Sequence, residues 1–205
     1  ARIVDVVDRN GRLLYRKRVY RNGREVLLID NRRYYRDDKI SGRDLLIGAG
    51  IGLVAGAAIV AMSEPRVTIP RERYIVDYDR ASDDDIYEAL TAPPVERLDR
   101  SYSLDEVRYS RPLRDRMRRV DLDTVTFDFG SWEVGADQER ALERMAAGIN
   151  RALDKNPDEI FLIEGHTDAV GSEEDNLSLS DRRAQAVAEI LTTAFGVPPE
   201  NLVTQ

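Results

Sequence analysis

The residues between 163 and 187 combine several side chains that could do chemistry: His166, the only histidine of the chain, many carboxylates and two adjacent arginines. One option is a metal site, in which His166 and Asp168 are ligands and three more acids add oxygens, Glu173, Glu174 and Asp175. Zinc sites, however, usually draw on more His or Cys than a single histidine. The acids also lack the alternate spacing and central glycine of a calcium loop. The sequence therefore predicts no metal site.

A second option is nucleophilic catalysis by Ser178 or Ser180, with His166 as the base. No nucleophile elbow surrounds either serine, and both serines have a simpler use near the start of a helix. We therefore predict no catalytic residue. The protein is expected not to be an enzyme and to need no cofactor.

The third option is recognition of a charged ligand by one acid and one arginine. Asp168 follows a run that predicts a buried strand, where ligand crevices of open α/β sheets commonly lie. Arg183 is expected in the first or second turn of the next helix, where the helix dipole disfavours a cation unless an anion pairs with it. Asp168 would then take an ammonium group and Arg183 a carboxylate, through two parallel hydrogen bonds. An internal Asp168–Arg183 salt bridge explains the same residues equally well.

The elements that must position this stretch follow a regular order from residue 120 onward. Val125, Phe127 and Phe129 alternate with polar residues, which predicts a half-buried strand. The next expected elements are a helix with one apolar face, a buried strand, a helix that begins between 176 and 180, and a last strand, at 142–155, 159–165, 176–195 and 201–205. This order of strand, helix, strand, helix, strand predicts an α/β (α+β) sandwich with helices packed on a sheet.

The charged stretch also resembles the signature of the OmpA-like peptidoglycan-binding domain family, which runs G-H-T-D, then G, then N-x-x-L-S-x-x-R-A-x-x-V. The matching residues occur in order and without a gap: Gly165, His166, Thr167, Asp168, Gly171, Asn176, Leu179, Ser180, Arg183, Ala184 and Val187. FDFGS at 127–131 resembles the first strand and loop of the family, so the resemblance covers about residues 120–205. The family continues with a further helix and strand, and this domain is therefore expected to be C-terminally truncated.

The resemblance implies binding of the diaminopimelate of the peptidoglycan stem peptide, without cleavage. By position, Asp168 would take the diaminopimelate ammonium and Arg183 its carboxylate, while Asn176 and Thr167 would shape the loop and offer hydrogen bonds. The residues implied as structural turn residues are Gly165, His166 and Gly171. Gly130 stands where the family often has asparagine, so a side-chain contact to the ligand would be missing or replaced by backbone.

Residues 1–41 carry a short repeat in a basic setting. RNGR occurs at 9–12 and again at 21–24, between apolar and β-branched runs, and Asn-Gly in this setting predicts β-hairpins. Residues 1–44 hold 13 Lys or Arg against 7 Asp or Glu, whereas residues 121–205 hold 6 against 18. The arginines of this β-meander could meet phosphate, or they could keep a strand face solvated and deter edge pairing. The second interpretation is favoured, and no nucleic-acid partner is predicted.

Residues 42–63 form a Gly-rich apolar segment whose central part, 45–62, has no charged side chain. As a helix, this central part would span about 27 Å, near the short end of what crosses a hydrocarbon core. Glycines recur along it four residues apart: Gly48, Gly52 and Gly56. The spacing favours close helix approach, so we predict a membrane anchor and a homo-oligomer through it, although a buried segment or an apolar linker also fits. The basic residues ahead of it would place residues 1–44 on the cytoplasmic side.

Residues 64–119 have the composition of a charged linker with short helices. Ser103 and Glu106 have capping-box spacing, and Ser82 before three aspartates suits a helix N-terminus. The chain contains no cysteine, which excludes disulfides and thiolate sites within it. It opens without a signal-like segment and is expected to be a mature or excised piece.

These features predict a tether of the cell envelope of a Gram-negative bacterium: a membrane anchor, a spacer at 64–119, and a periplasmic domain at 120–205 that binds peptidoglycan. The alternative is an envelope assembly module that keeps the OmpA-like fold and binds another protein instead of the wall.

Overall fold

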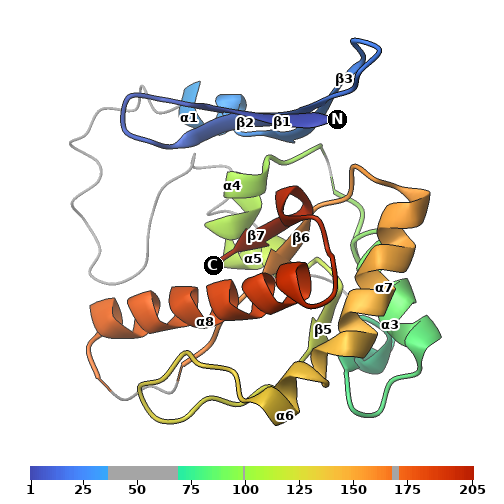
Figure 1. The fold of residues 1–205 in the computed structure, drawn as a ribbon, viewed down its shortest axis with the longest axis vertical. Helices are drawn as coiled ribbons and strands as arrows, with labels where there is room; N and C mark the ends of the chain where they lie inside the picture. The colour runs from blue at the N-terminus through green and yellow to red at the C-terminus, as the bar shows by residue number, and fades with distance from the viewer. Residues whose placement is uncertain (37–68, 99, 168–170) are drawn as a thin grey trace. The chain divides into compact units, whose positions relative to one another are not determined.

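The computed structural model describes the chain in four stretches, residues 1–36, 69–98, 100–167 and 171–205. Their contacts divide the chain into two compact units (Figure 1). Among the described residues, the N-terminal unit contains 1–36 and 94–117, and the C-terminal unit contains 69–93 and 118–205. Each unit is therefore built from two separate stretches of sequence.

The predicted membrane anchor at 45–62 lies outside the described residues. Within the four described stretches, no helix has the length and apolar character needed to cross a membrane.

The N-terminal unit is built on an antiparallel three-stranded meander of β1 (Arg2–Val7), β2 (Leu13–Val19) and β3 (Glu25–Asp30). Each RNGR repeat lies in a hairpin turn whose glycine has positive φ, 78° at Gly11 and 82° at Gly23. Glycine adopts this backbone conformation without the strain that a Cβ would add. The glycine N–H donates to the carbonyl three residues earlier, at 3.1 Å in the first turn and 3.0 Å in the second.

The described residues of this unit also form three short helices: α1 (Arg32–Arg36), α4 (Leu104–Arg108) and α5 (Arg111–Arg114). A buried polar contact joins the sheet to α4. Asn31, only 1% exposed, donates from Nδ2 to the Leu13 carbonyl at 3.1 Å and accepts at Oδ1 from the Asp105 N–H at 3.1 Å. The Tyr35 hydroxyl donates to Asp105 Oδ2 at 2.6 Å. Residues 94–117 are thus packed with the sheet, whereas the sequence predicts a linker over 64–119.

Helix α4 begins with the capping box that the sequence spacing predicts. Ser103 Oγ accepts from the Glu106 N–H at 3.3 Å, and Glu106 Oε2 accepts from the Ser103 N–H at 2.7 Å. Arg100 Nη2 lies 2.8 Å from Glu106 Oε1. Burial alone would raise the pKa of Glu106, but hydrogen bonds from Arg100 and Ser103 outweigh it and hold the pKa below its ordinary value.

This lowered pKa predicts acid-sensitive stability for the N-terminal unit. Because the folded state has the lower pKa, the stabilisation is complete above the ordinary glutamate pKa of about 4.3 and is lost as the pH falls through the folded value. Glu106→Gln should remove that part of the pH dependence of the urea midpoint, followed by far-UV circular dichroism. Glu189→Gln, at an exposed position of the C-terminal unit, should keep the wild-type profile. An unchanged profile for Glu106→Gln would contradict the assignment.

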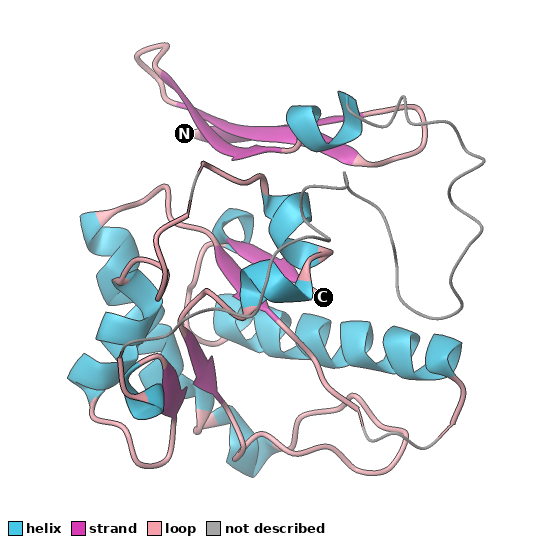
Figure 2. Cartoon of the chain, turned by 180° about the vertical axis from the view of Figure 1, so that it is seen from behind, coloured by secondary structure: helices cyan, strands magenta, loops and turns pink. Residues whose placement is uncertain are grey.

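The C-terminal unit is a mixed α/β assembly, seen from behind in Figure 2. Its elements are η3 (Arg71–Arg73), β4 (Ile75–Asp77), α3 (Asp83–Thr91), β5 (Arg119–Asp121), α6 (Ala136–Glu139), α7 (Leu142–Lys155), β6 (Phe161–Ile163), α8 (Glu173–Thr193), η4 (Pro199–Asn201) and β7 (Leu202–Thr204). Strands β4 and β5 pair in parallel, and β6 and β7 form a second parallel pair. The predicted α/β class is confirmed.

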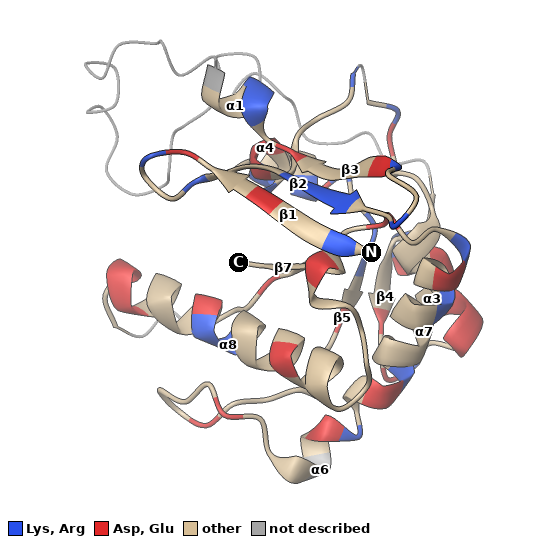
Figure 3. Ribbon diagram, turned by 45° about the horizontal axis from the view of Figure 1, so that its top comes forward, with Lys and Arg blue, Asp and Glu red and all other residues tan. Residues whose placement is uncertain are grey.

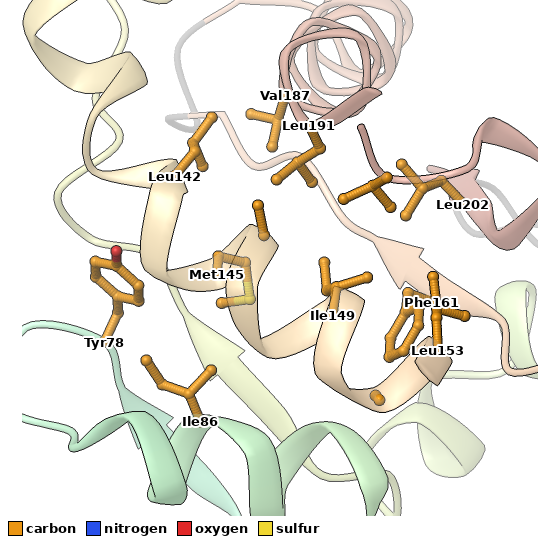
Figure 4. Close-up of a cluster of buried hydrophobic side chains, with 13 residues drawn as sticks. Tyr78, Ile86, Leu142, Met145, Ile149, Leu153, Phe161, Val187, Leu191 and Leu202 are labelled. Atoms are coloured by element: carbon orange, nitrogen blue, oxygen red, sulfur yellow. The ribbon is translucent and has the colours of Figure 1, made fainter. Parts of the chain in front are cut away.

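The hydrophobic core of this unit lies between α7, α8 and the β6–β7 pair (Figure 4). Its labelled members come from five helices and strands and the segment before α3: Tyr78, Ile86, Leu142, Met145, Ile149, Leu153, Phe161, Val187, Leu191 and Leu202. The spacing of Leu142, Met145 and Ile149 places all three on one face of α7. The helix at 142–155 and the strands within 159–165 and 201–205 therefore occur as the sequence predicts.

Residues 69–93 are part of this core, although the sequence places the start of the domain at 120. Ile86 on α3 is fully buried, and a Cβ added to Gly148 of α7 would lie 3.1 Å from Ile86 Cγ2, so the two helices pack closely. Arg144 of α7 reinforces the contact through a 2.8 Å bond from Nε to Asp83 Oδ1.

Ile86→Ala is expected to destabilise the C-terminal unit by about 2–5 kcal/mol, because it removes buried methyl groups and leaves a cavity between two packed helices. Urea unfolding followed by the fluorescence of Trp132, the single tryptophan, measures the loss. Leu177→Ala is the control, since Leu177 is 69% exposed and should change the midpoint little. Equal midpoints for the two variants would show that α3 is not part of the core.

Two predicted details of this unit are wrong. The described residues 124–129 form no strand, and Phe129 is 87% exposed, although Val125 and Phe127 do pack against the core. Helix α8 begins at Glu173, not between 176 and 180. The cause is an N-cap at Ser172, whose Oγ accepts from the Asp175 N–H at 3.1 Å.

Candidate functional site

Gly165 sets how closely α8 approaches the end of β6. A Cβ placed on Gly165 would lie 1.9 Å from the Ser180 carbonyl oxygen, a separation that no side chain can adopt. The backbone after β6 is also fixed from its other side, because the Gly165 N–H donates to the Gln205 carbonyl at 2.8 Å. Only glycine lets the backbone at 165 lie directly against α8.

Arg183 lies ten residues after the start of α8, so the expectation that it is in the first or second turn is wrong. The dipole of a helix acts mainly within its first and last turns, and it gives no reason for a cation at this position. The first turn is instead acidic, and the ribbon in Figure 3 is red, the colour of Asp and Glu, at this end of α8. Glu173, Glu174 and Asp175 lie in this first turn, where their negative charges interact favourably with the helix dipole.

The Arg183 guanidinium ties two segments together by donating to backbone carbonyls. Nε donates to the Ser131 carbonyl at 2.9 Å, and Nη2 donates to the Asp128 carbonyl at 3.4 Å. Nη1 donates to the His166 carbonyl at 2.8 Å. The guanidinium carbon also lies 4.8 Å from the centroid of the Phe127 ring. The loop at 127–131 and the turn after β6 are therefore joined through one side chain.

This arrangement leaves Arg183 able to bind an anion. A guanidinium has five N–H donors, and the three bonds to carbonyls leave one donor on each Nη group. The three acceptors are neutral, and none of the ion pairs among the described residues involves Arg183. Two adjacent charged donors suit a carboxylate, which accepts two parallel hydrogen bonds.

The other predicted site residues fall into two groups around Arg183. His166 is exposed, Thr167 is half-buried, and both lie in the turn that meets the guanidinium. Gly130, with φ of 70° and open space at its Cβ position, lies in the loop on the other side. Asp168 lies outside the described residues, so the ammonium partner and the Asp168–Arg183 salt bridge both stay predictions.

Asn176 and Gly171 lie together near the start of α8. Gly171 has φ of 110°, and a Cβ added to it would lie 3.8 Å from Asn176 Oδ1. Asn176 precedes Arg183 by seven residues, or about 10 Å along the helix axis. The pair therefore belongs to the entry of α8, at some distance from the guanidinium.

Sequence reasoning missed the groups that hold Arg183: the ring of Phe127 and the carbonyls of Asp128 and Ser131. The FDFGS run that contains them predicts only a strand and a loop, and a backbone carbonyl acceptor cannot be recognised from the side-chain composition. Next to them, the Arg182 guanidinium lies 4.6 Å from the Trp132 ring. Among the described residues, no group of three His, Asp or Glu side chains is placed to hold a metal ion.

Comparisons with known proteins identify the segment that carries this geometry. The model of the OmpA family matches residues 126–205. Outer membrane porin F of Pseudomonas aeruginosa is 39% identical over 82 residues, which cover 38% of this chain and 21% of the porin. The peptidoglycan-associated lipoprotein of Agrobacterium fabrum is 35% identical over 82 residues, which cover 40% of this chain and 44% of the lipoprotein. The matched part thus spans less than half of either relative.

Among solved structures, the peptidoglycan-associated lipoprotein from Burkholderia pseudomallei matches 39% of this chain and 65% of its own, at 34% identity and a TM-score of 0.33. Several relatives found in the sequence comparison share its name and come from other Gram-negative bacteria. The resemblance that the G-H-T-D signature predicts over about 120–205 is confirmed, and residues 126–205 are an OmpA-family domain.

Proposed function

We propose that this protein binds peptidoglycan without cleaving it, through a carboxylate that Arg183 holds at the junction of β6, α8 and the 127–131 loop. The observation that carries the proposal is the Arg183 guanidinium, which three backbone carbonyls orient while two of its donors stay unused among the described residues. A cation held this way is preorganised, because its rotamer freedom is lost before the ligand arrives.

The ligand proposed is the zwitterionic end of diaminopimelate in the stem peptide. Arg183 would hold its carboxylate and Asp168 its ammonium group, as charge complementarity requires. Thr167 and the backbone at Gly130 would offer hydrogen bonds beside them, and Asn176 would stabilise the entry of α8. The names of the relatives support the same polymer, since several are peptidoglycan-associated lipoproteins.

The role that follows is a tether of the cell envelope, with the C-terminal unit in the periplasm of a Gram-negative bacterium. The relatives support an envelope location through their names, which include outer membrane proteins. We propose no catalytic step, because recognition accounts for Arg183 and needs no nucleophile.

Sedimentation of the full chain with purified sacculi tests the proposal. Wild-type protein should pellet with sacculi, and Asp168→Asn, which keeps the shape and removes the charge, should stay largely in solution. Glu174→Gln is the control, because it removes an exposed carboxylate from the same stretch. Equal pelleting of all three proteins would contradict the site, and release of soluble muropeptides would contradict the non-catalytic role.

Free diaminopimelate provides an independent test of the ligand. A ligand that binds only the folded state stabilises it by about 2.7 kcal/mol at one hundred times its dissociation constant. Diaminopimelate should therefore raise the unfolding midpoint of the wild type and not that of Asp168→Asn. A module that binds only another protein would show no protection in either case.

A further inference from the structure

The path of the chain between the two units restricts where each unit can lie with respect to a membrane. In sequence order, described residues 1–36 belong to the N-terminal unit, 69–93 to the C-terminal unit, 94–117 to the N-terminal unit and 118–205 to the C-terminal unit. The chain therefore leaves each unit and returns to it.

The two parts of the N-terminal unit are held together by buried contacts, not by a surface encounter. Asn31 and Asp105, 1% and 3% exposed, share the hydrogen bond from the Asp105 N–H. The ring of Tyr34 stacks on that of Tyr109 with centroids 6.0 Å apart. Separating the parts would break the hydrogen bond between Asn31 and Asp105 and expose side chains that are buried when the parts pack together.

The two parts of the C-terminal unit are joined just as firmly. Strands β4 and β5 pair in parallel through Val76 and Val120, and Ile86 is fully buried in the common core. Arg151 of α7 adds a 2.7 Å ion pair to Asp84 of α3. Residues 69–93 and 118–205 must therefore lie on the same side of any membrane.

The two later links between the units, after residues 93 and 117, leave no room for a membrane crossing. Pro93 is followed directly by Pro94, and Met117 directly by Arg118, whereas a transmembrane helix needs about 20 apolar residues. Residues 94–117 must therefore lie on the same side of a membrane as the C-terminal unit. Their buried contacts with Asn31 and Tyr34 confine residues 1–36 to that side as well.

We infer that all described residues, including 1–36, lie on one side of any membrane that the apolar stretch 45–62 contacts. The inference replaces the sequence-based expectation that residues 1–44 are cytoplasmic, and it is independent of the proposed function.

Single-cysteine labelling tests the inference in the full chain, whose lack of cysteine gives a clean background. Arg9→Cys and Gln185→Cys, one at an exposed position of each unit, are expressed in a Gram-negative bacterium with a permeabilised outer membrane and an intact inner membrane. A membrane-impermeant maleimide should label both positions to the same extent before the inner membrane is disrupted. Labelling of Gln185→Cys before disruption and of Arg9→Cys only afterwards would overturn the inference.

A second pair of exposed positions, Arg21→Cys and Glu189→Cys, repeats the test so that one unstable variant cannot decide it. If all four positions label only after disruption, the units share a side and the inference holds. That result would, however, contradict the proposed function, because peptidoglycan lies outside the inner membrane. The two proposals can therefore fail separately.

Discussion

Arg183→Lys is expected to reduce the binding of the full chain to sacculi by about 100-fold or more, despite the retained positive charge. Lysine has a compact ammonium group with three donors and no planar fork. It cannot satisfy the carbonyls of Asp128, Ser131 and His166 and also present two parallel donors to a carboxylate. Hydrogen bonds to charged groups contribute about 1.5–3 kcal/mol each, so the loss of one or two accounts for a change of this size.

The measurement is a sedimentation isotherm with increasing amounts of sacculi at fixed protein concentration. Arg182→Lys is the matched control, because Arg182 is the neighbouring residue on α8, is exposed, and contacts the Trp132 ring and not the three carbonyls. Its isotherm should stay within about two-fold of the wild type, as expected for loss of a cation–π contact at an exposed site. If the two lysine variants bind sacculi equally well, the Arg183 guanidinium is not the group that binds peptidoglycan.

The fluorescence of Trp132 separates lost binding from a disordered loop. Trp132 is the single tryptophan, is 42% exposed, and directly follows Ser131, whose carbonyl Arg183 holds. Arg183→Lys should therefore change the emission of the free protein, because the 127–131 loop loses its anchor. Asp168→Asn should impair binding and leave that emission unchanged.

Gly165→Ala is expected to destabilise the C-terminal unit strongly, with a loss of about 3 kcal/mol or more in the free energy of unfolding. The added Cβ would lie 1.9 Å from the Ser180 carbonyl, and backbone, not a flexible side-chain end, is the group in contact. Overpacking a close-packed region usually costs about 1–3 kcal/mol, and here relief requires a shift of α8 against β6. That shift would also displace Arg183, so binding to sacculi should fall in the same variant.

Gly130→Ala is the matched control for the added methyl group. Gly130 has φ of 70° but nothing within 4 Å of its Cβ position, so alanine there costs only the backbone strain of about 1–2 kcal/mol. Urea unfolding followed by Trp132 fluorescence compares the two variants. A Gly165→Ala midpoint equal to that of Gly130→Ala would show that α8 does not press on the backbone at residue 165.

Local patterns in the sequence predict most of the elements of the C-terminal unit. The apolar face from Leu142 to Leu153 and the short runs at 159–165 and 201–205 encode α7, β6 and β7, because side-chain periodicity follows backbone geometry directly. The start of α8 was also present in the sequence, since Ser172 and Asp175 have the spacing of a helix cap. Asn176, Ser178 and Ser180 are also suitable N-cap residues, and the local sequence does not show which of these positions starts the helix.

By itself, then, the sequence determined the OmpA-family signature and the α/β class, and it predicted Arg183 as a residue of the binding site. The tertiary structure decided what that arginine contacts: the carbonyls of Ser131 and His166, 52 and 17 residues away along the chain. It also decided that 94–117 packs with the N-terminal sheet and 69–93 with α7. The physical reason is the same in both cases. Contacts to backbone carbonyls and long-range packing leave no periodic pattern in the sequence. They form only when distant segments fold into one core.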